Sequence, residues 1–268
     1  MRSLLTLLFA LAVSPLVRAA APDTAWPTPS PTQLQWLGER IYANECNRQP
    51  ACLLSWNVGE DFPSLGIGHF IWYRVGQEGI YHETFPALLR FLSEQGRTLP
   101  AWLSQGDFEQ PWPDRESFLA AREGEELQAL QALLQNSVEL QTAFIVQRFQ
   151  AALPTLLASA PPDERAMLEQ RLLQVTQAAP PYGLYALIDY VHFKGEGTRE
   201  SERYQAQGWG LLQVLQAMPA AGDDPLAAFV AAADTVLTRR VANAPAERGE
   251  ERWLPGWRNR LLTYLPAP

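Results

Sequence analysis

Histidine and cysteine are scarce in this chain, whose 268 residues include three histidines and two cysteines. His82 is followed by a glutamate but lacks the second histidine of a zinc hydrolase, and the three histidines, His69, His82 and His192, are scattered along the sequence. The sequence also contains no phosphate-binding loop, no dinucleotide fingerprint and no GxSxG elbow. These absences argue against nucleotide-dependent, zinc-dependent and serine-hydrolase chemistry. We predict neither a metal nor a cofactor.

Basic residues are outnumbered by acidic ones, 21 against 29, which gives a formal net charge of −8 at pH 7. A nucleic-acid-binding domain carries a basic patch, so this composition argues against a nucleic-acid partner. An anionic polymer would also be repelled at long range. Such a polymer could still bind if a basic cleft lies within the acidic surface, which sequence alone does not reveal.

Long hydrophobic runs are absent, and the apolar run over residues 4–13 is too short to span a bilayer. Arg2 precedes this run and small residues follow it, a pattern typical of a secretory signal peptide. We therefore expect a signal peptide over residues 1–19 and a proline-rich leader over 20–32. The protein is expected to be periplasmic or secreted, without stable membrane insertion. A short membrane anchor is the alternative interpretation, and the oligomeric state is not indicated.

The two cysteines, Cys46 and Cys52, lie close together in a chain that we expect to be exported. Such a pair is expected to form a disulfide, which would fix the turn directly after Glu45. A metal-binding pair is the alternative, but the histidines that would complete such a site are scattered along the sequence.

Helical periodicity dominates the chain beyond residue 83, whereas strand patterns are confined to one short region. Ser30 or Thr32 can cap a first helix whose apolar positions run from Leu34 to Tyr42. Residues 53–57 and 65–73 are predicted to form the two strands of a hairpin. Further helices are expected near residues 85–92, 116–122, 125–134, 138–153, 165–175, 182–191, 209–217, 225–239 and 253–265, with breaks at Pro100, Pro111, Pro113, Pro154, Pro161 and Pro162. We predict one α+β domain, predominantly α, over residues 33–268.

Candidate chemical groups concentrate at the end of the first helix and in residues 56–73, which read WNVGEDFPSLGIGHFIWY. Glu45 ends the helix, where the helix dipole disfavours a negative charge and so favours the protonated carboxyl. Trp56 is expected to strengthen this effect as an apolar neighbour. A protonated carboxyl is the general acid that glycoside hydrolysis needs. Glu39 is the rival, in a position more typical of a solvent-facing helix residue.

The hairpin supplies candidates for a second catalytic group. Glu60 or Asp61 could orient water or stabilise an oxocarbenium ion, and Ser64 could hold a water molecule through its hydroxyl. Adjacent acids at a hairpin tip are also common turn residues, and Ser64 could equally stabilise the turn. The sequence therefore leaves the second catalytic residue open.

Gly66 and Gly68 fall within the second predicted strand, where glycine normally weakens pairing. A sugar ring or a packed helix close to the backbone would explain both glycines. His69 follows them and could act as an acid or base, or as a structural hydrogen-bonding residue. We include these three residues and Trp56 among the candidate substrate-binding residues.

A polar, glycine-rich segment follows the apolar helix predicted near residues 182–191. Its Lys194, Glu196 and Tyr204 could line the groove opposite the hairpin and bind sugar hydroxyls or an acidic group. A helix cap followed by a solvated loop is the alternative. Glu196 is the reserve candidate for the acid. Most of the nine tryptophans are expected in the core rather than stacked on sugars.

Glu45, the hairpin, Ser64 and the GIGH segment at residues 66–69 together resemble the active-site segment of phage-type lysozymes, within the lysozyme-like superfamily. Residues 186–195, ALIDYVHFKG, resemble the central helix of that family, and residues 209–217, 229–240 and 253–262 resemble its terminal helices, including an Arg-rich turn. The resemblance implies a lysozyme-like fold with an enlarged helical part and a polysaccharide substrate.

The chain departs from the family pattern in two ways. The hairpin aspartate of the family would fall near Val58, so Asn57, Glu60 or Asp61 must replace it. A helical insertion at about residues 83–178 separates the two similar blocks.

The expected function is that of an exported glycosidase, of muramidase type, acting on peptidoglycan or a related β-linked glycan. A lytic transglycosylase using Glu45 alone and a chitosanase-like enzyme are the enzymatic alternatives. A non-catalytic periplasmic protein that binds glycan or a partner is the alternative from another class.

Overall fold

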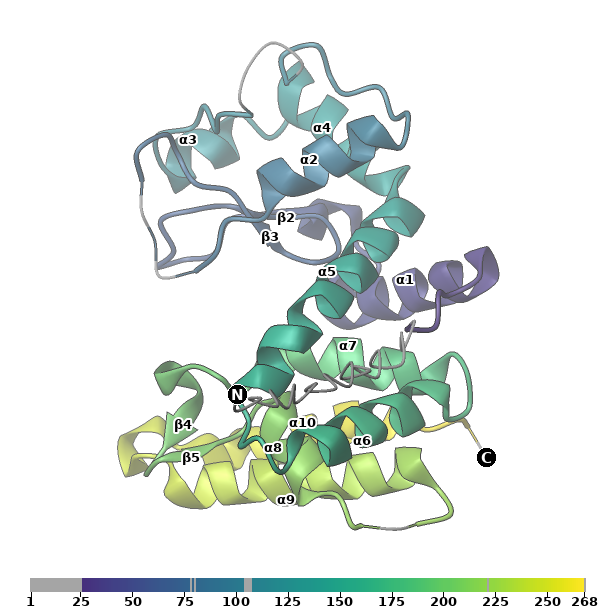
Figure 1. Ribbon diagram of the computed structural model, residues 1–268. Coiled ribbons are helices and arrows are strands. Elements are labelled where there is room, and N and C mark those ends of the chain that lie inside the picture. Colours follow the sequence, from purple (N-terminus) through teal and green to yellow (C-terminus); the bar gives the residue numbers. More distant parts are fainter. Residues whose placement is uncertain (1–25, 78, 80, 104–107, 221, 268) are drawn as a thin grey trace, which may run out of the picture.

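The computed structural model describes residues 26–77, 79, 81–103, 108–220 and 222–267, and the chain is predominantly helical (Figure 1). The predicted signal peptide and the first part of the leader lie outside the described residues. Two small antiparallel sheets accompany the helices, in agreement with the predicted α+β class. Within the described part, we find no helix that combines the length and apolar character needed to cross a membrane.

The described helices and strands follow a simple order along the chain. The helices are α1 (Pro31–Cys46), α2 (Phe85–Glu94), α3 (Arg115–Ala120), α4 (Glu125–Gln135), α5 (Val138–Ala158), α6 (Arg165–Gln177), α7 (Tyr182–Lys194), α8 (Leu211–Ala217), α9 (Pro225–Asn243) and α10 (Leu254–Leu262). The strands are β1 (Leu54–Ser55), β2 (Ser64–Leu65), β3 (Phe70–Ile71), β4 (Arg203–Tyr204) and β5 (Gln207–Gly208). The first sheet has the order β1-β2-β3, and β4 pairs with β5.

The elements form two groups that α5 connects (Figure 1). One group contains the β1-β2-β3 sheet with α2, α3 and α4, and the other contains α6 to α10 with the second sheet. α5 runs from the first group to the second and packs along α1. The predicted insertion at residues 83–178 therefore supplies the connecting helix itself, together with helices on both sides of it.

Helix α1 begins and ends where local sequence signals place it. Ser30 Oγ accepts a hydrogen bond from the Gln33 N–H at 3.3 Å, and Gln33 Oε1 accepts one from the Ser30 N–H at 2.8 Å. This capping box makes Ser30, rather than Thr32, the cap residue. At the other end, Asn47 adopts a left-handed conformation with φ 47°, which terminates the helix. Glu45 therefore lies in the last turn of α1, as predicted.

The GIGH segment forms a turn between β2 and β3, so the prediction of a continuous strand over residues 65–73 is wrong. Gly66 and His69 have φ angles of +69° and +45°. These left-handed conformations reverse the chain, whereas a strand needs extended backbone throughout.

Pro154 lies inside α5, so the predicted break at this residue is also wrong. Leu153 and Leu156, on either side of it, are each 1% exposed. Full burial of a leucine contributes about 1.5–3 kcal/mol. Two such side chains offset the cost of about 3 kcal/mol of a proline within a helix. The other predicted proline breaks lie between helices.

Candidate active site

A cavity of about 510 Å³, called the groove below, opens between the end of α1, the predicted hairpin region (the β1–β2 loop with β2 and β3), α7 and α10. Of the residues predicted from the sequence, Glu45, Glu60, Ser64 and His69 line it. Asn57, named above as a possible replacement for the hairpin aspartate, also lines the groove. The other lining residues are Phe62, Ile71, Tyr81, His192, Phe193 and Arg260. The candidate acid and two of the hairpin candidates therefore share one space.

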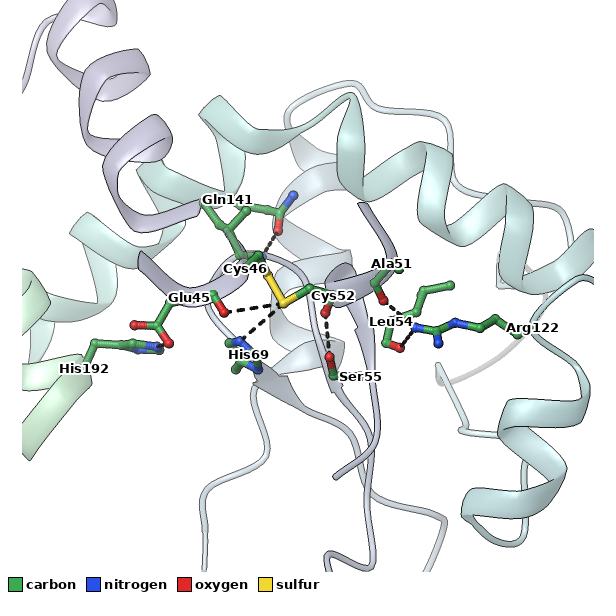
Figure 2. Close-up of a disulfide and its surroundings, with 11 residues drawn as sticks. Glu45, Cys46, Ala51, Cys52, Leu54, Ser55, His69, Arg122, Gln141 and His192 are labelled. Carbon is green, nitrogen blue, oxygen red and sulfur yellow. Dashed lines mark hydrogen bonds and ion pairs between the residues drawn. A yellow bond between two sulfur atoms is a disulfide. The ribbon is translucent and has the colours of Figure 1, made fainter. Parts of the chain in front are cut away.

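The two carboxylate oxygens of Glu45 have different neighbours. Arg260 Nη2 donates a hydrogen bond to Oε1 at 2.5 Å. His192 Nε2 lies 3.8 Å from Oε2, and Figure 2 shows the two side chains pointing toward one another. From the sequence, only the helix dipole and apolar neighbours were expected around Glu45, whereas in the structure a guanidinium group binds its carboxylate. Oε2 is the oxygen not bound by Arg260, and hence the one available to exchange a proton with a ligand.

A buried network holds Arg260 in place. Arg260 donates to both carboxylate oxygens of Asp189, each at 2.8 Å, and Asp189 is 2% exposed. Tyr264 donates its hydroxyl to Asp189 at 2.7 Å, and Asn44 donates its amide at 3.2 Å. Burial lowers the pKa of Arg260, but the hydrogen bonds and charges of Asp189 and Glu45 raise it well above the usual range. Arg260 is therefore a permanent cation at a fixed position beside Glu45.

Only some of the hairpin residues that were predicted to act on a substrate line the groove. Asn57 donates its amide to Oε2 of Glu60 at 3.1 Å. Trp56 is 5% exposed and donates its indole N–H to the backbone oxygen of Glu60 at 2.7 Å, so it shapes the turn and offers no free ring to a sugar. Asp61 is exposed and does not line the groove. Glu60, together with Ser64, is therefore better placed than Asp61 to act on a bound ligand.

A packed side chain from α5 explains why the hairpin turn begins with glycine. The Ile67 N–H donates to Gln141 Oε1 at 3.0 Å. A Cβ atom on Gly66 would lie 2.3 Å from that oxygen, and one on Gly68 would lie 2.6 Å from the ring of Phe70. Of the two explanations left open by the sequence, the structure supports the packed helix at Gly66.

Cys46 and Cys52 form the predicted disulfide, with Cα atoms 5.4 Å apart (Figure 2). The bridge ties the end of α1 to the residues that lead into β1 and so fixes the turn after Glu45. His69 Nε2 lies 4.0 Å from Cys52 Sγ. The side chains of His69, Cys46 and Cys52 are close enough together to bind one metal ion. The two sulfurs are bonded to each other, however, and a metal-binding pair is not what the structure contains.

Lys194 and Tyr204, predicted to bind substrate, do not line the groove. Lys194 is buried, with Nζ 3.9 Å from the ring centroid of Phe193 and 3.4 Å from that of Trp257. Burial, followed by the charges of nearby arginines, lowers the pKa of Lys194 to about 6. Tyr204 donates its hydroxyl to the buried carboxylate of Glu250 at 2.8 Å. Both side chains pack within the helical group rather than facing a ligand.

Glu196 lines a second cavity, of about 290 Å³, which adjoins the groove because His192 lines both. Gly68 also lines this second cavity. Burial, followed by the charge of Glu202, raises the pKa of Glu196. The reserve acid is therefore beside the groove but not in it.

Several groove residues were missed from the sequence: Phe62, Tyr81, His192, Phe193 and Arg260. Tyr81 is 50% exposed and its ring centroid lies 5.8 Å from that of Phe62, so the hairpin side of the groove carries aromatic surface suited to stacking on sugars. For Arg260, the one indication in the sequence was that residues 253–262 resemble a terminal helix of the lysozyme family.

Comparisons with family models, curated proteins and solved structures found no match to this chain.

Proposed function

We propose that this chain is an exported glycoside hydrolase of lysozyme-like fold that cleaves peptidoglycan or a related β-linked glycan. One observation carries the proposal: the carboxyl of Glu45, in the last turn of α1, shares a groove with Glu60 and Ser64 of the hairpin. Two carboxyl groups flanking one space are the arrangement that most glycosidases use. The two groups of elements on either side of α5 are also compatible with a lysozyme-like fold (Figure 1).

In the proposed mechanism, Glu45 acts as the general acid and donates a proton to the glycosidic oxygen. The donation uses Oε2, because Oε1 is occupied by Arg260. Glu60 and Ser64 position the attacking water, and Glu60 accepts its proton or stabilises the oxocarbenium ion. After bond cleavage Glu45 is a carboxylate, which the adjacent Arg260 stabilises.

A chitosanase-like activity is the second candidate, because charge favours it. The chain has a net charge of −8, and the groove cation Arg260 is already compensated by Asp189 and Glu45. An anionic glycan therefore meets no strongly basic channel among the described groove residues, whereas a cationic polymer would be attracted. The resemblance to phage-type lysozymes favours peptidoglycan over chitosan.

Digestion of purified peptidoglycan and of chitosan by the full chain tests the proposal. We expect new reducing ends from peptidoglycan and none from chitosan. Release from chitosan alone would favour the second candidate. Binding to either polymer without any cleavage would instead indicate a non-catalytic glycan-binding protein.

A further inference from the structure

The second cavity, the space of about 290 Å³ that adjoins the groove at His192, has both apolar walls and charged groups. Its apolar lining comes mainly from α5 and α7 and includes Ile145, Phe149, Ala152, Leu153, Ile188 and Val191. Arg148, on α5, and Glu196, in the loop after α7, bring opposite charges to the same space.

Arg148 and Glu196 do not close an ion pair with each other. Among the described residues, neither side chain has an ion pair or a hydrogen bond, and the contact of the Arg148 guanidinium is with the Phe144 ring, 5.7 Å from its centroid. The two groups still influence one another. Arg148 is exposed to solvent and Glu196 is half-buried. Partial desolvation lowers the pKa of Arg148, while the charge of Glu196 raises it. Both charged groups thus remain available to a ligand that enters between them.

The lining restricts the chemistry of such a ligand. A phosphate or a fatty acid would satisfy Arg148 but place its negative charge near Glu196. A neutral sugar could hydrogen-bond both groups through its hydroxyls, but it carries no charge to neutralise either one and no aliphatic side chain to cover the apolar walls. A molecule with a carboxylate, an ammonium group and a small apolar side chain satisfies all three features, because a carboxylate matches the planar guanidinium and an ammonium group pairs with a carboxylate.

We propose that the second cavity is a peptide-binding site. The ligand carboxylate binds Arg148, its ammonium group binds Glu196, and its apolar side chain packs against Ile145 and Val191. This site does not depend on the proposed hydrolase activity, since it is defined by its own lining. Because His192 lines both cavities, a peptide bound here lies beside the groove.

Calorimetric titration of the full chain with the dipeptide L-alanyl-L-leucine tests the site. Two blocked forms serve as matched probes: the N-acetylated dipeptide lacks the ammonium group, and the dipeptide amide lacks the carboxylate. We expect the free dipeptide to bind and each blocked form to bind about tenfold more weakly or worse, since tenfold is the loss of about 1.4 kcal/mol.

Two variants assign each charge to its partner. Arg148→Met should weaken binding of the free dipeptide about tenfold but have little further effect on the dipeptide amide, which lacks the carboxylate. Glu196→Gln should likewise weaken binding of the free dipeptide about tenfold but have little further effect on the N-acetylated form, which lacks the ammonium group. Ala152→Phe should block the cavity while leaving both charges in place. Arg258→Met, an exposed arginine on α10 paired with Asp234, should leave binding unchanged.

Three results would overturn the proposal. The free dipeptide could fail to bind at millimolar concentration, or both blocked forms could bind as tightly as the free one. Arg148→Met could also weaken the amide as much as the free dipeptide, which would show that the arginine does not contact the carboxylate. The probe comparison uses the unaltered protein, so it stands even if a variant does not fold.

Discussion

The Glu45→Gln variant should cleave peptidoglycan about 10²–10⁴ times more slowly than the unaltered protein, which is the range that general acid catalysis contributes. Glutamine has the shape of glutamate but cannot donate a proton as an acid. Its side-chain oxygen can still accept the hydrogen bond from Arg260, and Arg260 keeps its ion pair with Asp189. Glycan binding and thermal unfolding should therefore change little. Initial rates of reducing-end release, with melting curves for both proteins, provide the measurement.

Glu39→Gln is the matched control for this substitution. Glu39 lies on the same helix but is exposed, and its carboxylate accepts a hydrogen bond from Gln35 at 3.3 Å. The control should retain full activity. Full activity in Glu45→Gln would remove Glu45 as the acid, and Glu196 would be the next residue to substitute.

The Arg260→Met variant should lose about 3–5 kcal/mol of unfolding free energy, the usual cost of removing one partner from a buried ion pair. Asp189 is 2% exposed, and without Arg260 its negative charge would retain, among the residues that the structure describes, the hydrogen bonds from Tyr264 and Asn44. The Glu45 carboxylate would lose its cation as well. Urea unfolding at neutral pH, followed by circular dichroism, gives the free energies to compare.

A second arginine on α10 supplies the control. Arg258 pairs with Asp234, and their side chains are 49% and 40% exposed. Exposed pairs contribute about 0–1 kcal/mol, so Arg258→Met should have a small effect. Equal losses in the two variants would mean that the Arg260 network is not the buried anchor described above.

Local signals were sufficient to predict the framework of the site. Ser30, one of the two caps predicted, starts α1, and the close spacing of Cys46 and Cys52 indicated the disulfide after it. Together they located the helix end that carries Glu45. The hairpin was predicted from its Gly, Asp and Pro content, and β1 pairs with β2 there, although the second predicted strand is divided into β2 and β3 by a turn. Each of these features depends on residues that are near one another in the sequence.

Contacts between distant segments could not be predicted in the same way. Arg260 is 215 positions from Glu45, and no pattern around either residue indicates that they meet. The turn conformation at Gly66 depends on Gln141 of α5, which packs against it from another part of the chain. Helix α5 continues through Pro154 because its leucines are buried by tertiary packing.

Polar composition was a poor guide to which residues face the groove. Lys194 and Tyr204 follow an apolar helix in a glycine-rich segment, which suggested an exposed binding loop. In the structure, Lys194 is buried between two aromatic rings and Tyr204 binds the buried Glu250. The burial of a polar residue depends on the partners that the fold brings to it, and a single sequence does not show them.

Digestion of purified peptidoglycan in water enriched in ¹⁸O tests the central claim most directly, because hydrolysis places one oxygen atom of water on each new reducing end. We predict that mass spectrometry will find soluble fragments that carry one ¹⁸O atom per cleaved bond, and that Glu45→Gln will release almost none. Fragments with anhydro ends and no ¹⁸O, or the absence of any released fragment, would contradict hydrolysis at the groove.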